Sequence, residues 1–101
     1  MENQHRKISG YRELTQGEID LMNEIKALGP VIEAVTLKVR KHLKSQLDAC
    51  VTYDMIPVVH NQAEMDRLEA AEPEKWLRWG SDSMQQALMN LTRSVAQPTF
   101  F

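Results

Sequence analysis

The fold of this chain is decided by one long stretch, residues 15–47, which reads TQGEIDLMNEIKALGPVIEAVTLKVRKHLKSQL. It opens with Thr15-Gln16-Gly17-Glu18, a capping box that predicts the start of a helix. Apolar residues then recur at helical spacing; they are Ile19, Met22, Ile25, Ile32, Val35, Val39, Leu43 and Leu47. Because the later members follow a near-heptad rhythm, the stretch predicts a long helix that packs on another helix.

Gly29-Pro30 interrupts this stretch. Proline has no N–H to donate, and its ring clashes with the carbonyl four residues earlier, which belongs to Lys26. The apolar spacing resumes directly after the interruption, at Ile32. We therefore predict that the helix kinks near Gly29-Pro30 and continues.

The rest of the chain predicts a connection and two further helices. Residues 48–60 lose the helical rhythm and read as a loop or a short extended piece. Asn61-Gln62-Ala63-Glu64 resembles a second capping box, which would open a short acidic helix to about Ala71. Pro73 suits the first turn of a final helix that stops before Pro98. The apolar residues of that final helix are Trp76, Trp79, Met84, Leu88, Leu91 and Val95.

These elements predict an all-α fold: a single domain, residues 1–101, built as a helical hairpin of two long helices with a polar arm at residues 1–14. A chain of 101 residues buries little more than ~60% of its surface, and small helical chains often complete their cores by association. We therefore expect a homo-oligomer larger than a dimer. The final helix would supply its contacts, with Phe100 and Phe101 as candidate seals.

Composition excludes several classes of protein. The net charge of −2 argues against a general binder of duplex nucleic acid, which is usually strongly basic. Cys50 is the only cysteine, so neither an internal disulfide nor a cysteine-based metal site is possible. The apolar run at 55–59 is broken by proline and is too short to span a bilayer. The polar N-terminus does not read as a signal peptide, and we expect a reducing cytosolic compartment without membrane contact.

Catalysis is not expected. The three histidines, His5, His42 and His60, are scattered along the chain, and no metalloprotease motif, glycine-rich phosphate loop or nucleophile elbow occurs. Acidic residues at helical spacing are far more often a solvated face than a catalytic pair. The sequence thus predicts a protein that is not an enzyme and that needs no metal or cofactor.

The N-terminal arm is the strongest candidate for a binding segment. Residues 2–14, ENQHRKISGYREL, combine cations, amide side chains, a glycine and a tyrosine just ahead of a helix start. Such a segment suits a small anionic ligand with flat bases. Tyr11 has two interpretations: a hydrophobic staple on the first helical turn, or a face on which a base stacks. Gly10 would let the backbone approach a ligand closely.

Lys26 is a second candidate, because its ammonium group falls on the apolar side of the first helix, near Met22 and Ile19. Lys26 has two interpretations: its stem packs while the ammonium reaches water, or a desolvated ammonium is aimed at a phosphate. A rival reading of the chain is a small DNA-binding or transcription-modulating protein. Its groove-facing cations would be Lys38, Arg40, Lys41 and Lys44. The acidic pI and the lack of a helix-turn-helix pattern argue against it.

Two stretches of the chain carry a family resemblance. Residues 2–29, ENQHRKISGYRELTQGEIDLMNEIKALG, and residues 89–101, MNLTRSVAQPTFF, resemble the phage anti-CBASS cyclic-nucleotide sponges. This is the second described anti-CBASS class, which shares a helical hairpin domain with certain anti-Thoeris sponges. The resemblance covers roughly residues 1–45 and 76–101. Residues 48–72 look like an insertion at the hairpin tip.

The resemblance implies a function and a site. It implies a homo-oligomer, usually a hexamer, that sequesters cyclic nucleotide signals of bacterial CBASS immunity in the host cell cytoplasm without cleaving them. The ligands would be cyclic dinucleotides, such as 3′,3′-cyclic GMP-AMP, and cyclic trinucleotides in separate pockets. The family's stacking tyrosine matches Tyr11 and its phosphate-contacting lysine matches Lys26. The other candidate contacts are Arg6, Lys7, Ser9, Gly10 and Arg12.

Overall fold

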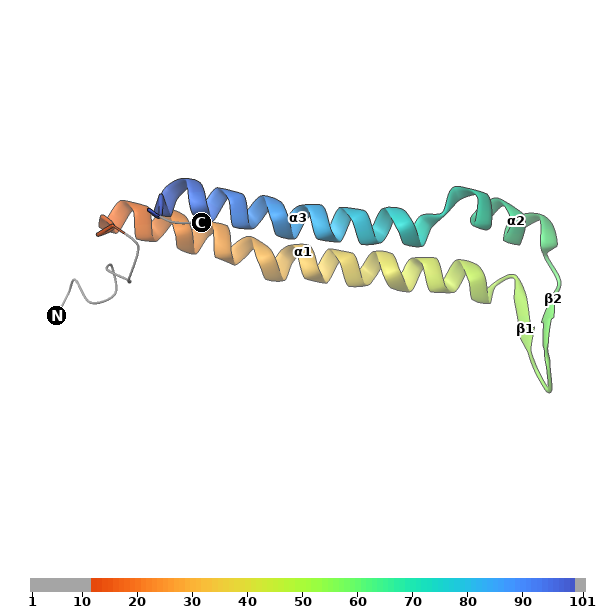
Figure 1. The fold of residues 1–101 in the computed structure, drawn as a ribbon. Coiled ribbons are helices and arrows are strands. Elements are labelled where there is room, and N and C mark those ends of the chain that lie inside the picture. The colour runs from red at the N-terminus through yellow and green to blue at the C-terminus, as the bar shows by residue number, and fades with distance from the viewer. Residues whose placement is uncertain (1–11, 100–101) are drawn as a thin grey trace. The chain divides into compact units, whose positions relative to one another are not determined.

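The structure, a computed structural model, describes residues 12–99, and this range is mostly helical (Figure 1). The elements in chain order are α1 (Gln16–Asp48), β1 (Val51–Tyr53), β2 (Pro57–Val59), α2 (Gln62–Ala71) and α3 (Pro73–Ala96). The predicted pair of long helices is confirmed in α1 and α3. The all-α prediction needs one correction, because a small β-hairpin lies between α1 and α2. No helix within residues 12–99 is both long and apolar enough to cross a membrane.

The chain divides into two compact units, which are described separately. One comprises Met1–Ile32 and Ser83–Phe101, and the other comprises Glu33–Asp82. The first unit thus holds the N-terminal part of α1 and the C-terminal part of α3. The second holds the rest of both helices, the hairpin and α2.

In the first unit, the predicted capping box sets the start of α1. The backbone N–H of Glu18 donates to the Thr15 hydroxyl oxygen at 3.2 Å, and the backbone N–H of Thr15 donates to Glu18 Oε1 at 2.8 Å. These reciprocal bonds satisfy donors that the first helical turn leaves without partners. Among the residues that the structure describes in this unit, the buried apolar ones are Leu14, just before the box, and Ala96, at the end of α3.

Helix α1 runs through Pro30 without ending, so its predicted continuation is confirmed and its kink stays a prediction. The prediction of its inward face needs correction at three positions. Val35, Val39 and Leu47 are exposed, whereas Thr36, next to Val35, and Gln46, next to Leu47, are partly covered. Apolar residues therefore lie outside the inward face of α1, where the described chain alone does not cover them.

In the second unit, the predicted loop at 48–60 contains a short antiparallel hairpin. Its register pairs Val51 with Val59, Thr52 with Val58 and Tyr53 with Pro57. The N–H of His60 donates to the carbonyl of Cys50 at 2.9 Å. Since hydrogen-bonded pairs alternate along an antiparallel ladder, the pair of Tyr53 and Pro57 is not a hydrogen-bonded one. Pro57 thus occupies a position where its missing N–H costs the ladder nothing.

The short helix α2 begins and ends as its sequence predicts. The Asn61 side chain accepts from the N–H of Glu64 at 3.2 Å. Glu72 ends the helix in the left-handed conformation, with φ 49° and ψ 51°, and its N–H donates to the carbonyl of Leu68. Pro73 explains the position of this stop, because proline disfavours helical geometry in the preceding residue. The carbonyl of Glu72 then accepts hydrogen bonds from the backbone N–H groups of Lys75 and Trp76. The same residue therefore ends α2 and precedes the start of α3.

We predict that Thr15→Ala destabilises the protein by about 0.5–2 kcal/mol, the usual cost of removing an N-cap hydroxyl. The cause is the N–H of Glu18, which would lose its acceptor. Urea unfolding followed by circular dichroism measures the change. Thr15→Ser, which keeps the hydroxyl, should retain most of the stability; equal losses in both variants would contradict the capping role.

Candidate functional site

The structure describes two of the predicted site residues, Arg12 and Lys26, and both belong to the first unit. The other candidates in the N-terminal arm lie outside the described residues; they are Arg6, Lys7, Ser9, Gly10 and Tyr11. The geometry of the candidate site is therefore built from the two described cations and their surroundings.

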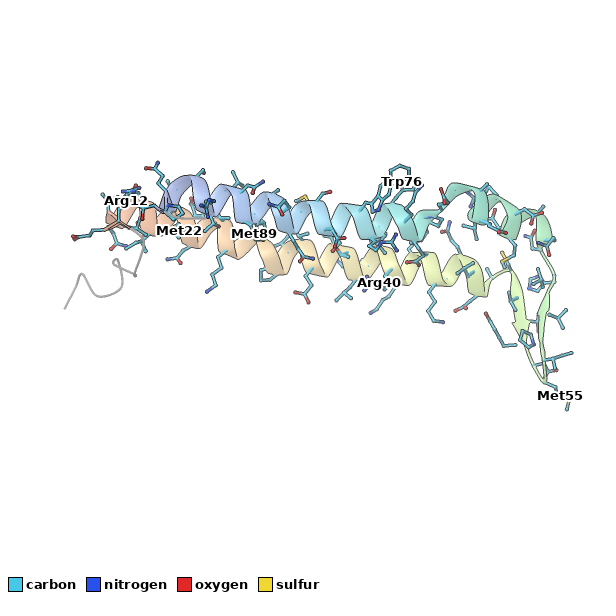
Figure 2. The ribbon with its side chains drawn as sticks, in the orientation of Figure 1. Arg12, Met22, Arg40, Met55, Trp76 and Met89 are labelled. Carbon is cyan, nitrogen blue, oxygen red and sulfur yellow. The ribbon has the colours of Figure 1, made fainter. Side chains whose placement is uncertain are left out.

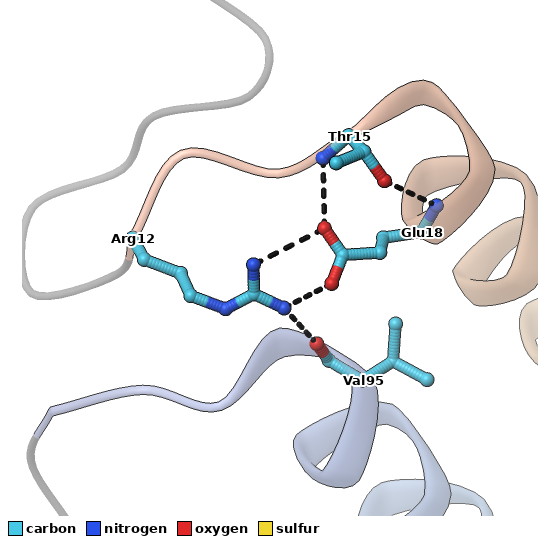
Figure 3. Close-up of polar contacts among 4 residues, drawn as sticks. All are labelled: Arg12, Thr15, Glu18 and Val95. Atoms are coloured by element: carbon cyan, nitrogen blue, oxygen red, sulfur yellow. Dashed lines mark hydrogen bonds and ion pairs between the residues drawn. The ribbon is translucent and has the colours of Figure 1, made fainter.

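The Arg12 guanidinium joins three segments of the first unit (Figure 3). Its Nη1 donates to Glu18 Oε1 at 3.1 Å, and its Nη2 donates to Glu18 Oε2 and, at 2.9 Å, to the carbonyl oxygen of Val95. The same Glu18 Oε1 accepts the N–H of Thr15. We call Arg12, Glu18 and the Val95 carbonyl the Arg12 clamp. It holds Arg12 against the first turn of α1 and the last turn of α3.

Electrostatics favour each contact of the Arg12 clamp. A guanidinium and a carboxylate match each other in two parallel charge-assisted hydrogen bonds. Val95 lies in the last turn of α3, where carbonyls have no partner within the helix and where a cation is favoured. Hydrogen bonds from Arg12 and from the Thr15 backbone lower the pKa of Glu18 from 4.5 to about 2. The carboxylate in turn raises the pKa of Arg12 above its ordinary value.

The contact of Arg12 with a ligand stays a prediction, because both of its Nη atoms already donate to protein oxygens. Its Nε is buried and has no hydrogen-bond partner among residues 12–99. An anion would therefore compete with Glu18 and Val95 for this guanidinium. No sequence signal beyond the capping role of Glu18 indicates this arrangement, since the third partner is a backbone carbonyl 83 positions away.

Lys26 is exposed on α1, so the described single chain does not itself remove its ammonium from water, and the predicted phosphate contact stays a prediction. Its neighbours Ile19 and Met22 are partly covered, while Lys26 itself makes no ion pair or hydrogen bond with the described residues. The positions one helical turn away hold Met22, Asn23, Gly29 and Pro30, none of which is acidic. Lys26 is thus a cation with no intrahelical carboxylate that would compete with an anionic ligand.

An aromatic and cationic cluster lies in the second unit, at the start of α3. The rings of Trp76 and Trp79 meet edge to face with centroids 5.2 Å apart. The ammonium of Lys75 lies 4.7 Å from one ring centroid and 5.1 Å from the other, and Glu72 holds it at 2.7 Å. Trp76 is 57% exposed and Trp79 is 49% exposed, so neither belongs to the core of the described chain (Figure 2). An oligomer contact stays a prediction for this pair.

The basic run of the rival DNA-binding hypothesis also lies in the second unit. Lys38, Arg40 and Lys41 are exposed, and Lys44 pairs with Asp48 at 2.7 Å. No group of three histidine, cysteine, aspartate or glutamate residues within 12–99 is placed to hold a metal ion. Cys50 is buried, and its thiol lies 3.3 Å from the carbonyl of Gln46.

The fold and the site together define a mostly helical protein in which an arginine is clamped to two helix ends, and in which α1 carries a lysine without an ion-pair partner among residues 12–99. No family model matches the chain. Among curated proteins, anti-CBASS protein 2 of Pseudomonas phage JBD67 is 39% identical to it over 105 residues, a match that covers 97% of each chain. The chain belongs to the anti-CBASS protein 2 family, as its sequence motifs predicted.

The Arg12 clamp predicts a pH dependence of stability. A carboxylate whose pKa is lowered on folding contributes stability above its unfolded pKa and loses it as the pH falls through the folded one. For Glu18 that window runs from about 4.5 down to about 2. Wild-type melting temperature should therefore fall more between pH 5 and pH 3 than that of Glu18→Gln. Asp48→Asn, which removes the partner of an exposed lysine, is the control; equal pH slopes in wild type and Glu18→Gln would contradict the prediction.

Proposed function

We propose that this protein is a phage immune-evasion protein that binds the cyclic di- and trinucleotide signals of bacterial CBASS immunity and sequesters them uncleaved. Membership of the anti-CBASS protein 2 family supports the class of function. The structural observation that carries the proposal is Lys26, an exposed ammonium without an ion-pair partner among the described residues. A phosphate is the natural partner of such a point charge.

Symmetry explains how so small a chain could hold a cyclic dinucleotide. The ligand has two phosphates and two flat bases, related by an approximate two-fold axis. One chain supplies one Lys26 and one Tyr11. A two-fold interface presents the same patch twice, and so offers two cations and two stacking faces. On this proposal the second chain completes the site, and it also supplies the cover that the exposed Lys26 lacks in a single chain.

The distribution of apolar residues supports the proposed homo-oligomer, for which the family resemblance suggests a hexamer. Five apolar residues of the described chain are buried: Leu14, Leu43, Cys50, Leu68 and Ala96. Many large apolar side chains are exposed on both long helices; on α1 they include Leu21, Leu28, Val31 and Val35, and on α3 they include Trp76, Met84, Met89 and Leu91. Burial against another chain would remove this surface from water.

Titration with 3′,3′-cyclic GMP-AMP tests the proposed function. We expect tight binding by wild type, and recovery of unmodified ligand by chromatography after the complex is denatured. Lys26→Ala should weaken binding at least tenfold, because a lost charge-assisted hydrogen bond is worth ~1.5–3 kcal/mol and a two-fold site loses it twice. Lys38→Ala removes another exposed lysine of α1 and should bind as wild type does.

Other outcomes of this titration are equally informative. Linear or mononucleotide products would show a nuclease instead of a sponge. Tight binding of duplex DNA at physiological salt, lost in Lys38→Ala and kept in Lys26→Ala, would favour the DNA-binding alternative.

The oligomer is tested by light scattering. We expect a mass above that of a dimer at micromolar concentration, and a lower mass for Leu91→Glu, because a charge buried in an apolar contact is unfavourable. Asn90→Glu places the same charge one residue away, at an exposed polar position of α3, and should keep the wild-type mass. A wild-type monomer would contradict the proposed assembly.

A further inference from the structure

The hairpin of the second unit is a two-stranded sheet, and its β1 edge has no partner strand within residues 12–99. We propose that this edge pairs with the β1 edge of a second copy of the chain. The two strands would run antiparallel about a two-fold axis at Thr52, so that two hairpins form one four-stranded sheet. This inference rests on the proposed homo-oligomer and names one of its contacts.

A hairpin of this size is only marginally stable by its own contacts. Each of its strands has three residues, and an isolated two-stranded hairpin needs a further strand or a packed helix to be stable in water. The hairpin projects beyond the end of α1 and the start of α2 (Figure 1). Its large side chains stay exposed in the single chain, with Tyr53 at 65%, Met55 at 94% and Ile56 at 70%. A further strand would supply hydrogen bonds and apolar contacts to this sheet.

The outer edge of β1 presents the backbone groups that a further strand needs. The hydrogen bond from the N–H of His60 to the carbonyl of Cys50 fixes the alternation of the ladder. Val51 and Tyr53 therefore fall in the pairs that are not hydrogen-bonded, and their N–H and C=O groups point away from β2. No other element within residues 12–99 forms a backbone hydrogen bond with these groups. An N–H and a C=O from each residue thus remain available along one edge.

One register uses all of these groups. It pairs Val51 with Tyr53 of the second copy, repeats this pair on the other side of the axis, and sets Thr52 opposite Thr52 of the second copy. The side chains suit this register, because an aromatic ring opposite a β-branched residue and threonine opposite threonine are favourable cross-strand pairs. An axis at Tyr53 would set Thr52 opposite Asp54. An axis at Asp54 would set two carboxylates opposite each other, which is unfavourable.

The two-fold axis makes this contact a closed one. The same edge is used on both copies, so each hairpin pairs with one other copy. The outer edges of the resulting sheet are the two β2 strands, where Pro57 offers no N–H to a further strand. The contact thus joins two chains without growing into a fibre. Larger assemblies would then need a second contact, for which the exposed apolar residues of α3 are available.

Disulfide cross-linking tests the proposed axis. Thr52→Cys would bring two thiols face to face, because the Cα atoms of a non-hydrogen-bonded pair are about 4.5 Å apart, within the range that a disulfide spans. Val58→Cys is the matched control, since Val58 lies opposite Thr52 on the same face of the hairpin. Its two copies would be three strand spacings apart, roughly 14 Å. Both variants also carry Cys50→Ala, which removes the only native cysteine.

We expect Thr52→Cys to form a disulfide-linked dimer under mild oxidation roughly tenfold faster than Val58→Cys, or more, because pairing holds its thiols at a high effective concentration. Non-reducing gel electrophoresis measures the rates. Circular dichroism on every variant reports whether the fold persists.

A second substitution tests whether the backbone of Tyr53 makes the contact. Tyr53→Pro, added to Thr52→Cys, should lower the rate to that of the control, because proline removes an N–H that the second copy needs. It costs the hairpin no ladder bond, since Tyr53 and Pro57 are not a hydrogen-bonded pair. Tyr53→Val keeps the N–H and should keep the fast rate. If Tyr53→Pro does not fold, the comparison of Thr52→Cys with Val58→Cys carries the test.

Two results would overturn the inference while the proposed assembly stands. In the first, wild type is an oligomer by light scattering, but Thr52→Cys cross-links no faster than Val58→Cys; the β1 edge would then be open to a strand of another protein or to none. In the second, Tyr53→Pro and Tyr53→Val cross-link equally fast. Failure of the proposed assembly looks different, because wild type itself would be a monomer, and the pairing of β1 strands would fall with it.

Discussion

Glu18 is the side chain on which the described part of the first unit depends. Its backbone N–H is capped by Thr15, and its carboxylate accepts from the Thr15 backbone and from both Nη atoms of Arg12. The carboxylate also lies in the first turn of α1, where the partial positive charge of a helix start favours an anion. One ionised group therefore orders the helix start, the preceding chain and, through Arg12, the end of α3.

The fold could be predicted from the sequence wherever the signals were local. Thr15 and Glu18, Asn61 and Glu64, and Pro73 each mark a helix start through bonds within one turn, and the structure confirms all three starts. Residues 48–60 were predicted as a loop or a short extended piece, but their pairing into a hairpin was not predicted, because strands of three residues show too little alternation to be recognised. The prediction of the inward face of α1 was wrong at Val35, Val39 and Leu47. Tertiary contact, and not apolar character alone, decides which side chains are covered, so that Thr36 is partly covered while Val35 is exposed.

The candidate site could be predicted only in part, for a related reason. The residue types and spacing of the arm and of Lys26 indicated an anionic ligand, and this contact stays a prediction. The engagement of Arg12 could not be predicted, since it depends on the backbone carbonyl of Val95, and every residue type carries such a carbonyl. Backbone acceptors at the ends of distant helices leave no mark in a sequence, although they decide whether a cation is available to a ligand.

The hairpin of the second unit has two unequal edges. Tyr53 and Pro57 face each other outside the hydrogen-bonded positions of the ladder, so their backbone groups point away from the partner strand. Tyr53, which is 65% exposed, offers an N–H and a carbonyl on its edge, whereas Pro57 offers only a carbonyl on the other. Open edges invite stray pairing between molecules, and proline is one device that discourages it. Proline thus opposes the addition of a strand from another molecule at the β2 edge, whereas nothing of this kind opposes it at the β1 edge. A charge or a proline at Tyr53 would protect the β1 edge when a less aggregation-prone variant is wanted.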